Sequence, residues 1–538
     1  MTACSKQSLV QPSLTAGNLA ISNNALSLLT TGDVVGKVTV GYQGWFSCAN
    51  DGSPFSTFWW HWSKDNGLPG NNNTANKSWP DVREYTNTYQ TAYANLGNGS
   101  PAKLFSSWDQ QTVDTHFRWM QENNIDVAAL QRFNPNGSEG PIRDGITAKV
   151  KTAAEAHGRK FYIMYDISGW DNFQTEIKTD WTSKMSAYIT SSAYARQGGK
   201  PVVCIWGLGF PDRTMTAAAE VDVINWFKSH GCYVIGGVPH EWRDYTVAGP
   251  KNFDAVFKAL NMISPWMIGA IGTIQESDSY YTNVNTPDMA YCKANGIAYQ
   301  PCVEPGDLSA RQRVHGDFMW RQFYNMIRVG AQGIYISMFD EYGEGNQIAK
   351  AGEDASMVPA GSGILGLDED GIHCSSDYYL RLTKDGGNML KGLIPLTSLR
   401  PTEPVIGGGG AHLPPIGQSL HIKGYNQLYV SGENGNGAMY CNTARADIWE
   451  TFTVVDAGNG KVALQSMGKY VSSENGVAAL TCNRASVGPW EQFDYITNSD
   501  GSVSLRGNNG KFVTQEDGTK PMICDRSTAS IWEKFTIE

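Results

Sequence analysis

Three carboxylates lie within five positions of this chain, Asp340, Glu341 and Glu344. They follow a short apolar run, Ile334–Phe339, whose β-branched and aromatic residues predict a buried strand. Crowded carboxylates repel one another, and a neighbouring like charge raises the pKa of one of them. Acid–base catalysis needs one protonated and one ionised carboxyl group. The pattern therefore predicts a catalytic site directly after this strand, and a solvated acidic loop is the plainer alternative.

Paired carboxylates beside aromatic residues favour the hydrolysis of glycosidic bonds. One acid protonates the leaving oxygen while the other acts as base or nucleophile. Aspartic proteolysis fits poorly, because the chain has no second matching acid motif. A Ca²⁺ or Mg²⁺ site also uses carboxylate oxygens. Asp368–Gly371 suits a cation better than the carboxylate cluster does, with a plain turn as the alternative. We predict no metal site and no cofactor.

The overall composition narrows the choice of partner. The 538 residues carry a formal charge of −10, whereas binding to nucleic acid phosphates needs a basic face. The chain holds 17 Trp, 24 Tyr and 58 Gly. Aromatic rings among small polar residues suit a polysaccharide or glycan, although a secreted, loop-rich protein has the same composition. We expect a monomer that binds no nucleic acid.

The N-terminal region bears on localisation. No run of about 18 apolar residues is present, so we expect no transmembrane segment. An apolar signal-peptide core is also missing. Ala3-Cys4 followed by a polar stretch resembles the cleavage end of a bacterial lipoprotein signal. We therefore expect a secreted or cell-surface protein anchored through Cys4, with a disordered leader and an incidental cysteine as the alternative.

The ten cysteines do not form a recognisable framework. None lies in a CxxC pair, which makes a zinc site improbable. Cys204, Cys232 and Cys302 lie in apolar runs and are predicted to be buried thiols. Cys292 and Cys302 are the pair to test first for a disulfide.

After a polar leader at 1–35, residues 36–403 alternate short apolar runs with longer amphipathic stretches, which is typical of βα units. The strand candidates are Val38–Phe46, Val127–Phe133, Lys160–Tyr165, Val202–Trp206, Tyr233–Val238, Trp266–Ile271, Ala298–Val303 and Gly333–Phe339. The helix candidates include Thr112–Asn123, Ala148–Ala156, Ala218–His230, Phe318–Val329 and a last helix within Ser375–Lys391. Eight strands that alternate with helices predict an α/β fold, the (β/α)8 TIM barrel, as the catalytic domain.

A barrel of this type places its active residues just after the C-terminal ends of the strands. Six polar or aromatic residues at those positions are predicted to bind substrate: Trp45, Asp166, Trp206, His240, Glu241 and Glu304. Trp60 is a further candidate stacking platform. The structural alternatives are core packing for the tryptophans, a structural role for Asp166 and helix capping for His240 and Glu241.

A Gly/Pro-rich linker at 404–417 precedes a repeat of about 40 residues. Each unit contains a Glu-Asn-Gly or Glu-Asp-Gly turn, a cysteine and a W-E-x-F motif, beginning at Trp449, Trp490 and Trp532. Three copies predict a closed all-β domain, a β-trefoil, over 418–538. The motif resembles the fascin-like trefoil family, and carbohydrate binding is one role for such a domain. We expect the tryptophans and phenylalanines of the motif to pack the core.

The segment Phe339–Ile348, FDEYGEGNQI, resembles the FNEWHEGTQI segment of glycoside hydrolase family 99, the endo-α-mannosidase and endo-α-mannanase family. Glu304–Asp307 with Arg311 resembles its PGYDDTR region. Tyr42–Phe46 and His61-Trp62 are compatible with its aromatic opening. The resemblance implies a retaining glycosidase with His61 and Tyr342 among its substrate-binding residues.

Carried over by position, the resemblance implies that Glu341 helps the substrate's own 2-hydroxyl group to attack the anomeric carbon. Glu344 is then the general acid/base. Asp340, Tyr342 and Gly343 replace Asn, Trp and His of the family pattern, which alters the cleft wall. An α-mannan-type substrate is implied. The alternatives are a barrel glycosidase acting on xylan, arabinan or α-glucan, and a carbohydrate-binding protein without catalytic activity.

Overall fold

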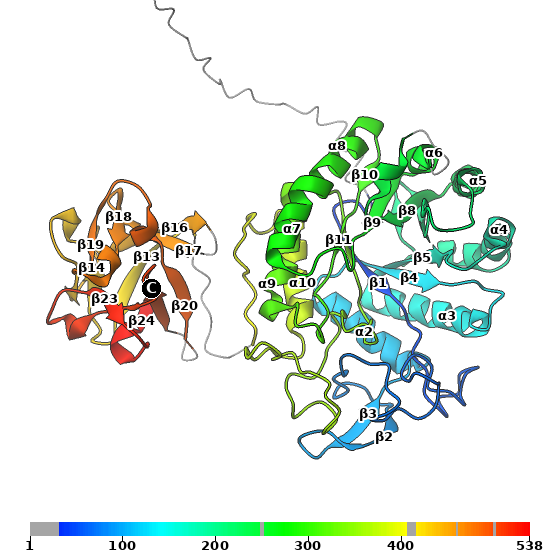
Figure 1. The fold of residues 1–538 in the computed structure, drawn as a ribbon, viewed down its shortest axis with the longest axis horizontal. Coiled ribbons are helices and arrows are strands. Elements are labelled where there is room, and N and C mark those ends of the chain that lie inside the picture. Colours follow the sequence, from blue (N-terminus) through cyan, green and yellow to red (C-terminus); the bar gives the residue numbers. More distant parts are fainter. Residues whose placement is uncertain (1–31, 248–251, 406–415, 459–460, 499–501) are drawn as a thin grey trace, which may run out of the picture.

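The computed structural model describes residues 32–247, 252–405, 416–458, 461–498 and 502–538 (Figure 1). The described residues form two hydrophobic cores, one drawn from residues 34–389 and one from residues 420–535. The predicted leader and linker fall almost wholly outside the described residues, and so does Cys4.

The first core surrounds a parallel sheet. Its strands, in sheet order, are β10 (Ala298–Tyr299), β9 (Met262–Trp266), β8 (Tyr233–Pro239), β7 (Lys200–Trp206), β5 (Lys160–Asp166), β4 (Val127–Arg132), β1 (Val38–Tyr42), β12 (Ile334–Ile336) and β11 (Cys302–Val303), and the short β6 (Arg196–Gln197) pairs antiparallel with β7. The last strand, β12, pairs with both β1 and β11. The segment that contains β10 and β11 thus links β9 to β12. With its helices, this sheet resembles the predicted (β/α)8 barrel.

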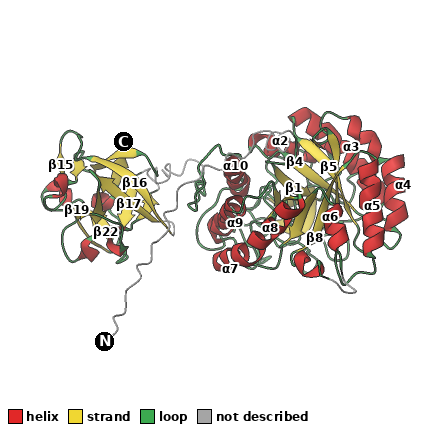
Figure 2. Cartoon of the chain, turned by 90° about the horizontal axis from the view of Figure 1, so that it is seen from above, coloured by secondary structure: helices red, strands yellow, loops and turns green. Residues whose placement is uncertain are grey.

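Helices cover the outside of the sheet, as both ribbon views show (Figures 1 and 2). They are α2 (Gln110–Glu122), α3 (Gly140–His157), α4 (Phe173–Ser183), α5 (Ala217–Ser229), α6 (Asp254–Ala259), α7 (Ile274–Tyr280), α8 (Thr286–Asn295), α9 (Asp317–Arg328) and α10 (Tyr378–Leu390). The amphipathic pattern has the expected effect in α9, where Phe318, Phe323 and Met326 are buried. The helix predicted within Ser375–Lys391 is α10.

Seven of the eight predicted strand windows contain an observed strand. The exception is Trp266–Ile271, because β9 is Met262–Trp266. The Ser264-Pro265 pair in this strand has the composition of a turn and hides it from pattern analysis. The long segment between β1 and α2 also contains a hairpin that was not predicted, formed by β2 (Tyr89–Asn95) and β3 (Pro101–Leu104).

The second core belongs to an all-β domain. Its strands are β13 (Ser419–Gly424), β14 (Tyr429–Ser431), β15 (Tyr440–Thr443), β16 (Thr451–Gly458), β17 (Lys461–Ser466), β18 (Lys469–Ser472), β19 (Thr481–Arg484), β20 (Asp494–Thr497), β21 (Val503–Arg506), β22 (Phe512–Thr514), β23 (Ile523–Arg526) and β24 (Phe535–Ile537). The three predicted turns adopt one conformation, with positive φ at each of three successive residues: Glu433–Gly435, Glu474–Gly476 and Glu516–Gly518. The sequence repeat is therefore also a repeat of backbone structure.

The three units of this domain close on one another through backbone hydrogen bonds. Met439 N donates to Leu480 O (2.9 Å), Leu480 N donates to Met522 O (2.8 Å), and Met522 N donates to Met439 O (2.9 Å). Each unit thus gives one bond to the next and receives one from the previous unit. The result is a closed triangle with internal three-fold repetition.

The repeated W-E-x-F motif divides its residues between the core and the surface. Phe452, Phe493 and Phe535 are buried, as predicted. The prediction for the tryptophans is wrong, because 39–42% of each tryptophan is exposed. The glutamate after each tryptophan points inward instead: Glu491 Oε2 accepts the N–H of Gly488 at 2.8 Å. The buried glutamate thus accepts a backbone N–H of its own loop, and the indole beside it in the sequence faces outward.

The cysteines in the described residues are nine buried free thiols. Cys204, Cys232 and Cys302 are among them, as predicted, and no disulfide joins Cys292 to Cys302. In the part of the chain that the structure describes, no helix is both long and apolar enough to cross a membrane.

A buried ion pair ties the sheet to its helices. Arg132, at the end of β4, is 1% exposed and donates from Nε to Asp180 Oδ2 (2.7 Å) and from Nη2 to Asp180 Oδ1 (2.6 Å). Asp180 lies in α4 and also accepts the Tyr165 hydroxyl at 2.8 Å. Removing the arginine would leave a buried carboxylate with the tyrosine alone.

We expect Arg132→Met to lower the free energy of unfolding by about 3–5 kcal/mol, since breaking a buried pair strands the remaining charge. Denaturant unfolding measures the loss. Arg118→Met is the matched control, because Arg118 makes half-exposed pairs with Glu84 and Glu122 and should cost less than about 1 kcal/mol. Equal losses in the two variants would contradict a structural role for the Arg132 pair.

Candidate active site

The loop after β12 is held to the loop after β1 by Asp340. This carboxylate is fully buried and accepts the backbone N–H groups of Gln43 and Gly44, each at 2.8 Å. Burial raises the pKa of Asp340 to about 6, against the lowering effect of these two bonds. Asp340 is therefore a positioning residue, which fixes the backbone on which Glu341 and Glu344 stand.

Glu341 is the buried member of the glutamate pair. Its side chain is nearly inaccessible, and Oε2 accepts a hydrogen bond from Gln43 Nε2 at 2.8 Å. Burial raises the pKa of Glu341 well above its usual value, and the charges of Glu344 and Asp340 raise it further. The proton on Glu341 is thus held more tightly than on a surface glutamate.

Glu344 is the exposed member of the pair. The residues after it are fixed by Arg313, which donates from Nη2 to the carbonyl oxygens of Gly345 (2.8 Å) and Gln347 (2.9 Å). Arg313 Nε also donates to Gly306 O at 3.0 Å, in the loop after β11. A solvent-accessible carboxylate therefore stands on a rigid loop next to a buried one.

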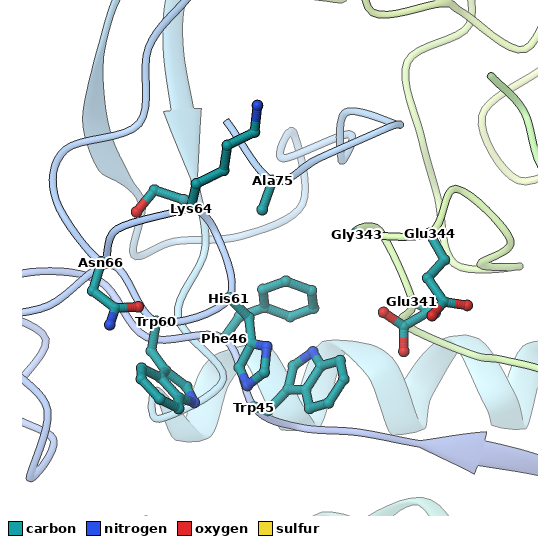
Figure 3. A pocket seen from close by; sticks show the side chains of 11 residues that line it. Trp45, Phe46, Trp60, His61, Lys64, Asn66, Ala75, Glu341, Gly343 and Glu344 are labelled. Carbon is teal, nitrogen blue, oxygen red and sulfur yellow. The ribbon is translucent and has the colours of Figure 1, made fainter. Parts of the chain in front are cut away.

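Two cavities meet at this pair. The first, the Trp60 cavity, measures about 350 Å³ and is lined by Trp45, Phe46, Trp60, His61, Ser63, Lys64, Asn66, Ala75, Glu341, Gly343 and Glu344 (Figure 3). The second, the Trp206 cavity, measures about 300 Å³ and is lined by Gln43, Trp45, Gln131, Phe133, Met164, Asp166, Trp206, Trp266, Met338, Glu341 and Glu344. Both cavities share Trp45 and the two glutamates, so a ligand that fills both would pass the pair.

The wall of the Trp60 cavity opposite the glutamates is aromatic. Figure 3 shows Glu341 and Glu344 next to each other, facing the rings of Trp45 and His61. These two rings stack with centroids 3.8 Å apart and an interplanar angle of 11°. Burial lowers the pKa of His61, so its imidazole is neutral near pH 7. Neutral, flat faces of this kind suit the apolar face of a sugar ring.

The Trp206 cavity combines aromatic faces with a fixed carboxylate. Trp206 and Trp266 meet edge to face with centroids 5.5 Å apart. Asp166, at the end of β5, accepts Gln131 Nε2 at 2.9 Å through Oδ2 and Ser168 N at 2.9 Å through Oδ1. A positioned carboxylate and amide beside an indole can bind hydroxyl groups while the ring stacks.

Of the residues predicted to bind substrate, Trp45, His61, Asp166 and Trp206 line the cavities, whereas His240, Glu241 and Tyr342 do not. Tyr342 is fully buried against Phe46, Trp62 and Phe105 and donates its hydroxyl to Lys350 O at 2.9 Å. It supports the wall from behind, because the chain turns inward between the two glutamates.

His240 and Glu241 follow β8 and lie outside both cavities. His240 Nε2 is 2.8 Å from Glu241 Oε2, and 44% and 39% of the two side chains are exposed. Glu241 also accepts the Tyr245 hydroxyl at 3.3 Å. These contacts are made within the loop after β8, and neither residue lines one of the two cavities.

Glu304 lies behind the pair instead of lining a cavity. It follows β11, is 3% exposed, and its Oε1 has no hydrogen-bond partner. Burial raises the pKa of Glu304 to about 8, with smaller contributions from Asp307 and Glu344. Glu304 is thus a neutral carboxyl group at pH 7, and the charge of Glu344 contributes to its raised pKa.

Trp60, a candidate stacking platform from the sequence, lines the first cavity. Several other lining residues were not predicted to bind substrate: Gln43, Gln131, Phe133, Trp266 and Met338. Gln131 and Phe133 lie at the end of β4, where the strand-end rule points. Trp266 was predicted to begin a strand, whereas it is the last residue of β9.

No cluster of three or more His, Cys, Asp or Glu side chains suited to a metal ion occurs in residues 32–538 outside the gaps already given. Asp368–Gly371, considered above for a cation, includes Asp370, whose Oδ2 lies 2.8 Å from His315 Nδ1. Two of the cavity carboxylates, Glu341 and Asp166, accept hydrogen bonds from amide or backbone donors instead.

No protein-family model and no curated protein matches this chain. Among solved structures, the GH99 endo-α-mannosidase from Bacteroides thetaiotaomicron is 16% identical, with 67% of this chain and 98% of that chain covered and a TM-score of 0.49. A glycoside hydrolase-like protein is 13% identical over 66% of this chain and 94% of its own, with a TM-score of 0.42. ThreeFoil, a designed three-fold symmetric protein, is 16% identical over 22% of this chain and 96% of its own, with a TM-score of 0.21. With TM-scores this low, none of these likenesses assigns an activity to this chain.

The burial of Glu304 generates a prediction about stability. The folded protein keeps the proton of Glu304 up to about pH 8, whereas a glutamate in the unfolded chain loses it near its ordinary pKa of 4.5. Stability therefore falls as the pH rises between these values. We expect Glu304→Gln to remove the share of this pH-dependent loss in unfolding free energy that Glu304 causes. One pKa unit corresponds to about 1.4 kcal/mol, so the rise from 4.5 to about 8 amounts to at most about 5 kcal/mol.

Urea unfolding at a series of pH values from 5 to 8.5 measures this difference between the wild type and Glu304→Gln. Glu155→Gln, on the surface of α3, is the control and should follow the wild type. Parallel curves for wild type and Glu304→Gln would show that Glu304 ionises normally in the folded protein.

Proposed function

We propose that this protein is a retaining glycoside hydrolase that cuts a polysaccharide or glycan. The observation that carries the proposal is the position of the glutamate pair, one buried and one exposed, at the junction of two cavities lined by aromatic rings. Stacking faces and fixed polar groups are the features that bind sugars, and paired carboxylates are the features that cut glycosidic bonds.

The environments of the two glutamates suit different roles. Glu344 is open to solvent, so it can regain a proton from water after each turnover, as a general acid must. Glu341 has a raised pKa because it is buried beside two other carboxylates. The proposed first step needs Glu341 ionised and Glu344 protonated, so the reacting form is the one in which Glu341 has given up its proton. In that form a carboxylate of raised pKa is the stronger base, which a weakly acidic sugar hydroxyl group needs.

The proposed reaction has two steps. In the first, Glu341 takes the proton of the substrate's 2-hydroxyl group as that oxygen attacks the anomeric carbon, and Glu344 protonates the departing glycosidic oxygen. In the second, Glu344 removes a proton from water, which attacks the anomeric carbon. The bond to the 2-oxygen breaks, and Glu341 returns the proton to that oxygen. Two inversions retain the configuration.

The all-β domain is proposed to be a β-trefoil of the fascin-like type, supported by its closed three-fold repeat. The motif Phe339–Ile348 makes an α-mannan-type polymer the first substrate to test. Because the pair lies between two cavities, we propose that sugar units bind on both sides of the bond that is cut. Release of oligosaccharides from the interior of a chain is then expected.

A reducing-sugar and product screen on α-mannan, α-glucan, xylan and arabinan tests the class of activity. Wild type and the Glu341→Gln/Glu344→Gln double variant are compared side by side. We expect products from the wild type alone, with retained anomeric configuration by NMR. Products from both proteins would move the chemistry to other residues, and inverted products would overturn the two-step mechanism.

The single variants separate the two roles. We expect Glu344→Gln to abolish cleavage of the natural polymer, but to spare substrates whose leaving group needs no proton. Glu341→Gln should lose activity on both, because the 2-hydroxyl group then has no base. General acid–base catalysis is worth about 10²–10⁴-fold, which sets the scale of each loss. Initial rates on the polymer and on an aryl glycoside measure the difference.

The control for these variants is Glu155→Gln, which leaves the cavities untouched and should keep full activity. Sugar binding by calorimetry shows whether each inactive variant is folded. Equal losses of Glu344→Gln on both substrate types would contradict its role as acid, and normal rates for Glu341→Gln would contradict its role as base.

Binding on both sides of the pair gives a further prediction. Trp60→Ala trims only the first cavity and Trp206→Ala trims the second. We expect each to raise KM for the polymer about 5–30-fold, since losing part of the burial of an indole costs about 1–2 kcal/mol. Trp226→Ala, in α5 and absent from both cavity linings, is the control. If only one of the two variants weakened binding, the ligand would occupy one cavity alone.

A further inference from the structure

Three tryptophans at equivalent places in the all-β domain are exposed although they are large and apolar. Trp449, Trp490 and Trp532 are 42%, 41% and 39% exposed, respectively. An exposed apolar residue precedes each: Ile448 (60%) and Ile531 (50%) in two of the units, and Pro489 in the other. Single exposed apolar residues are common on proteins. The same exposed pair at three equivalent positions is a repeated surface feature.

Each tryptophan is held by its backbone. Ser473 N donates to Trp490 O at 2.8 Å, and Gln515 N donates to Trp532 O at 3.0 Å. The donor in each case directly precedes the left-handed turn of the same unit. In the remaining unit, Gly432 N donates to Trp449 O at 2.8 Å. The indoles are thus mounted on fixed loops next to the repeated turns.

In the second unit an arginine clamps the loops around the tryptophan. Arg484 Nη2 donates to both oxygens of Glu474, in the turn, at 2.8 Å. Its Nε lies 3.7 Å from Oε1 of Glu491, the residue after Trp490. A platform held from both sides loses little freedom when a ligand settles on it, which favours binding.

The third unit repeats this clamp and the first unit lacks it. Arg526 pairs with Glu516 in the turn and lies 4.0 Å from Glu533, the residue after Trp532. The sheet registers place Thr443 where the other units have Arg484 and Arg526. A threonine side chain is too short to reach the turn carboxylate, so the loops around Trp449 have no such clamp.

The charges around the two clamped tryptophans are already paired, since each arginine faces the carboxylates of its own unit. Because one arginine faces at least two carboxylates in each of these units, the balance of these charges beside the indole is negative, which does not favour an anionic ligand. The surface offers a flat apolar face with fixed hydrogen-bonding groups nearby. An uncharged sugar ring has the complementary features, an apolar face and a rim of hydroxyl groups.

We propose that Trp490 and Trp532 are the platforms of two equivalent binding sites for the sugar rings of a neutral polysaccharide, and that Trp449 is the platform of a weaker third site. The choice of a polysaccharide rests on the proposed glycosidase function of the same chain. A repeating polymer can occupy several platforms at once, and linked sites raise avidity well above that of a single site.

Affinity electrophoresis of the full chain tests these sites. The Glu341→Gln/Glu344→Gln background prevents degradation, and native gels contain α-mannan, α-glucan, xylan or arabinan, with serum albumin gels as the protein control. We expect at least one polysaccharide to retard the chain. Trp490→Ala/Trp532→Ala should weaken the apparent affinity about tenfold or more, as loss of multivalent contact predicts. Trp449→Ala should weaken it about threefold or less.

Two further variants control for folding and for unspecific aromatic contact. Tyr425→Ala removes another exposed aromatic of the same domain, 60% exposed, and should bind as the parent does. Trp490→Phe/Trp532→Phe keeps flat apolar faces and should retain part of the affinity. Thermal unfolding of each variant at the parental temperature establishes that the domain is intact.

The proposal is overturned if none of the four polysaccharides retards the chain, or if the Trp490→Ala/Trp532→Ala chain binds as tightly as its parent. Retardation of equal size in the albumin gel would assign the indoles to protein contact instead. Wild-type hydrolysis of the same four polymers separates the two proposals. Hydrolysis without retardation removes only the surface sites, and retardation without hydrolysis removes only the glycosidase.

Discussion

The site depends on the two hydrogen bonds that the Asp340 carboxylate accepts, because they join the loop after β12 to the loop after β1. Strand β12 pairs with β1, so the loops after the last and first strands must meet. Their backbone N–H groups at Gln43 and Gly44 have no strand partner there, and Asp340 accepts both. Leaving such buried donors unpaired would cost about 1–3 kcal/mol each. Glu341 comes next in the chain, so the same bonds that complete the sheet also fix the backbone of the glutamate pair.

The electrostatics of the site follow from unequal burial along one short loop. Asp340 and Glu341 are buried, Glu344 is exposed, and Glu304 is buried behind them. Each buried carboxyl group has a raised pKa, with desolvation as the largest cause. Three carboxyl groups with raised pKa values, those of Glu304, Asp340 and Glu341, thus lie near the solvent-exposed Glu344. Burial sets this gradient, and the backbone and amide donors to Asp340 and Glu341 oppose it only in part. Among the described residues that line the cavities, the one cation is Lys64.

The parts of this structure that follow from local sequence were predictable. Short apolar runs ending in polar residues marked most strands and the glutamate pair, because burial and strand ends leave a periodic trace. Gln43 left no such trace, since its role depends on contacts with Asp340 and Glu341, hundreds of residues away. Tyr342 was predicted to bind substrate, but it directly follows Glu341 and its side chain points the other way, into the core. The outward turn of Trp490 was hidden, because a repeated motif fits a buried or an exposed indole equally well.

The triangle of backbone hydrogen bonds among Met439, Leu480 and Met522 fixes how many units the all-β domain can have. In open repeat arrays each unit contacts only its neighbours, so units can be added or lost at the ends. Here every unit is both donor and acceptor in a closed cycle. Deleting a unit would leave one buried donor and one buried acceptor unpaired, and inserting a fourth would open the cycle. The domain can therefore change by substitution within its units but not by gaining or losing one.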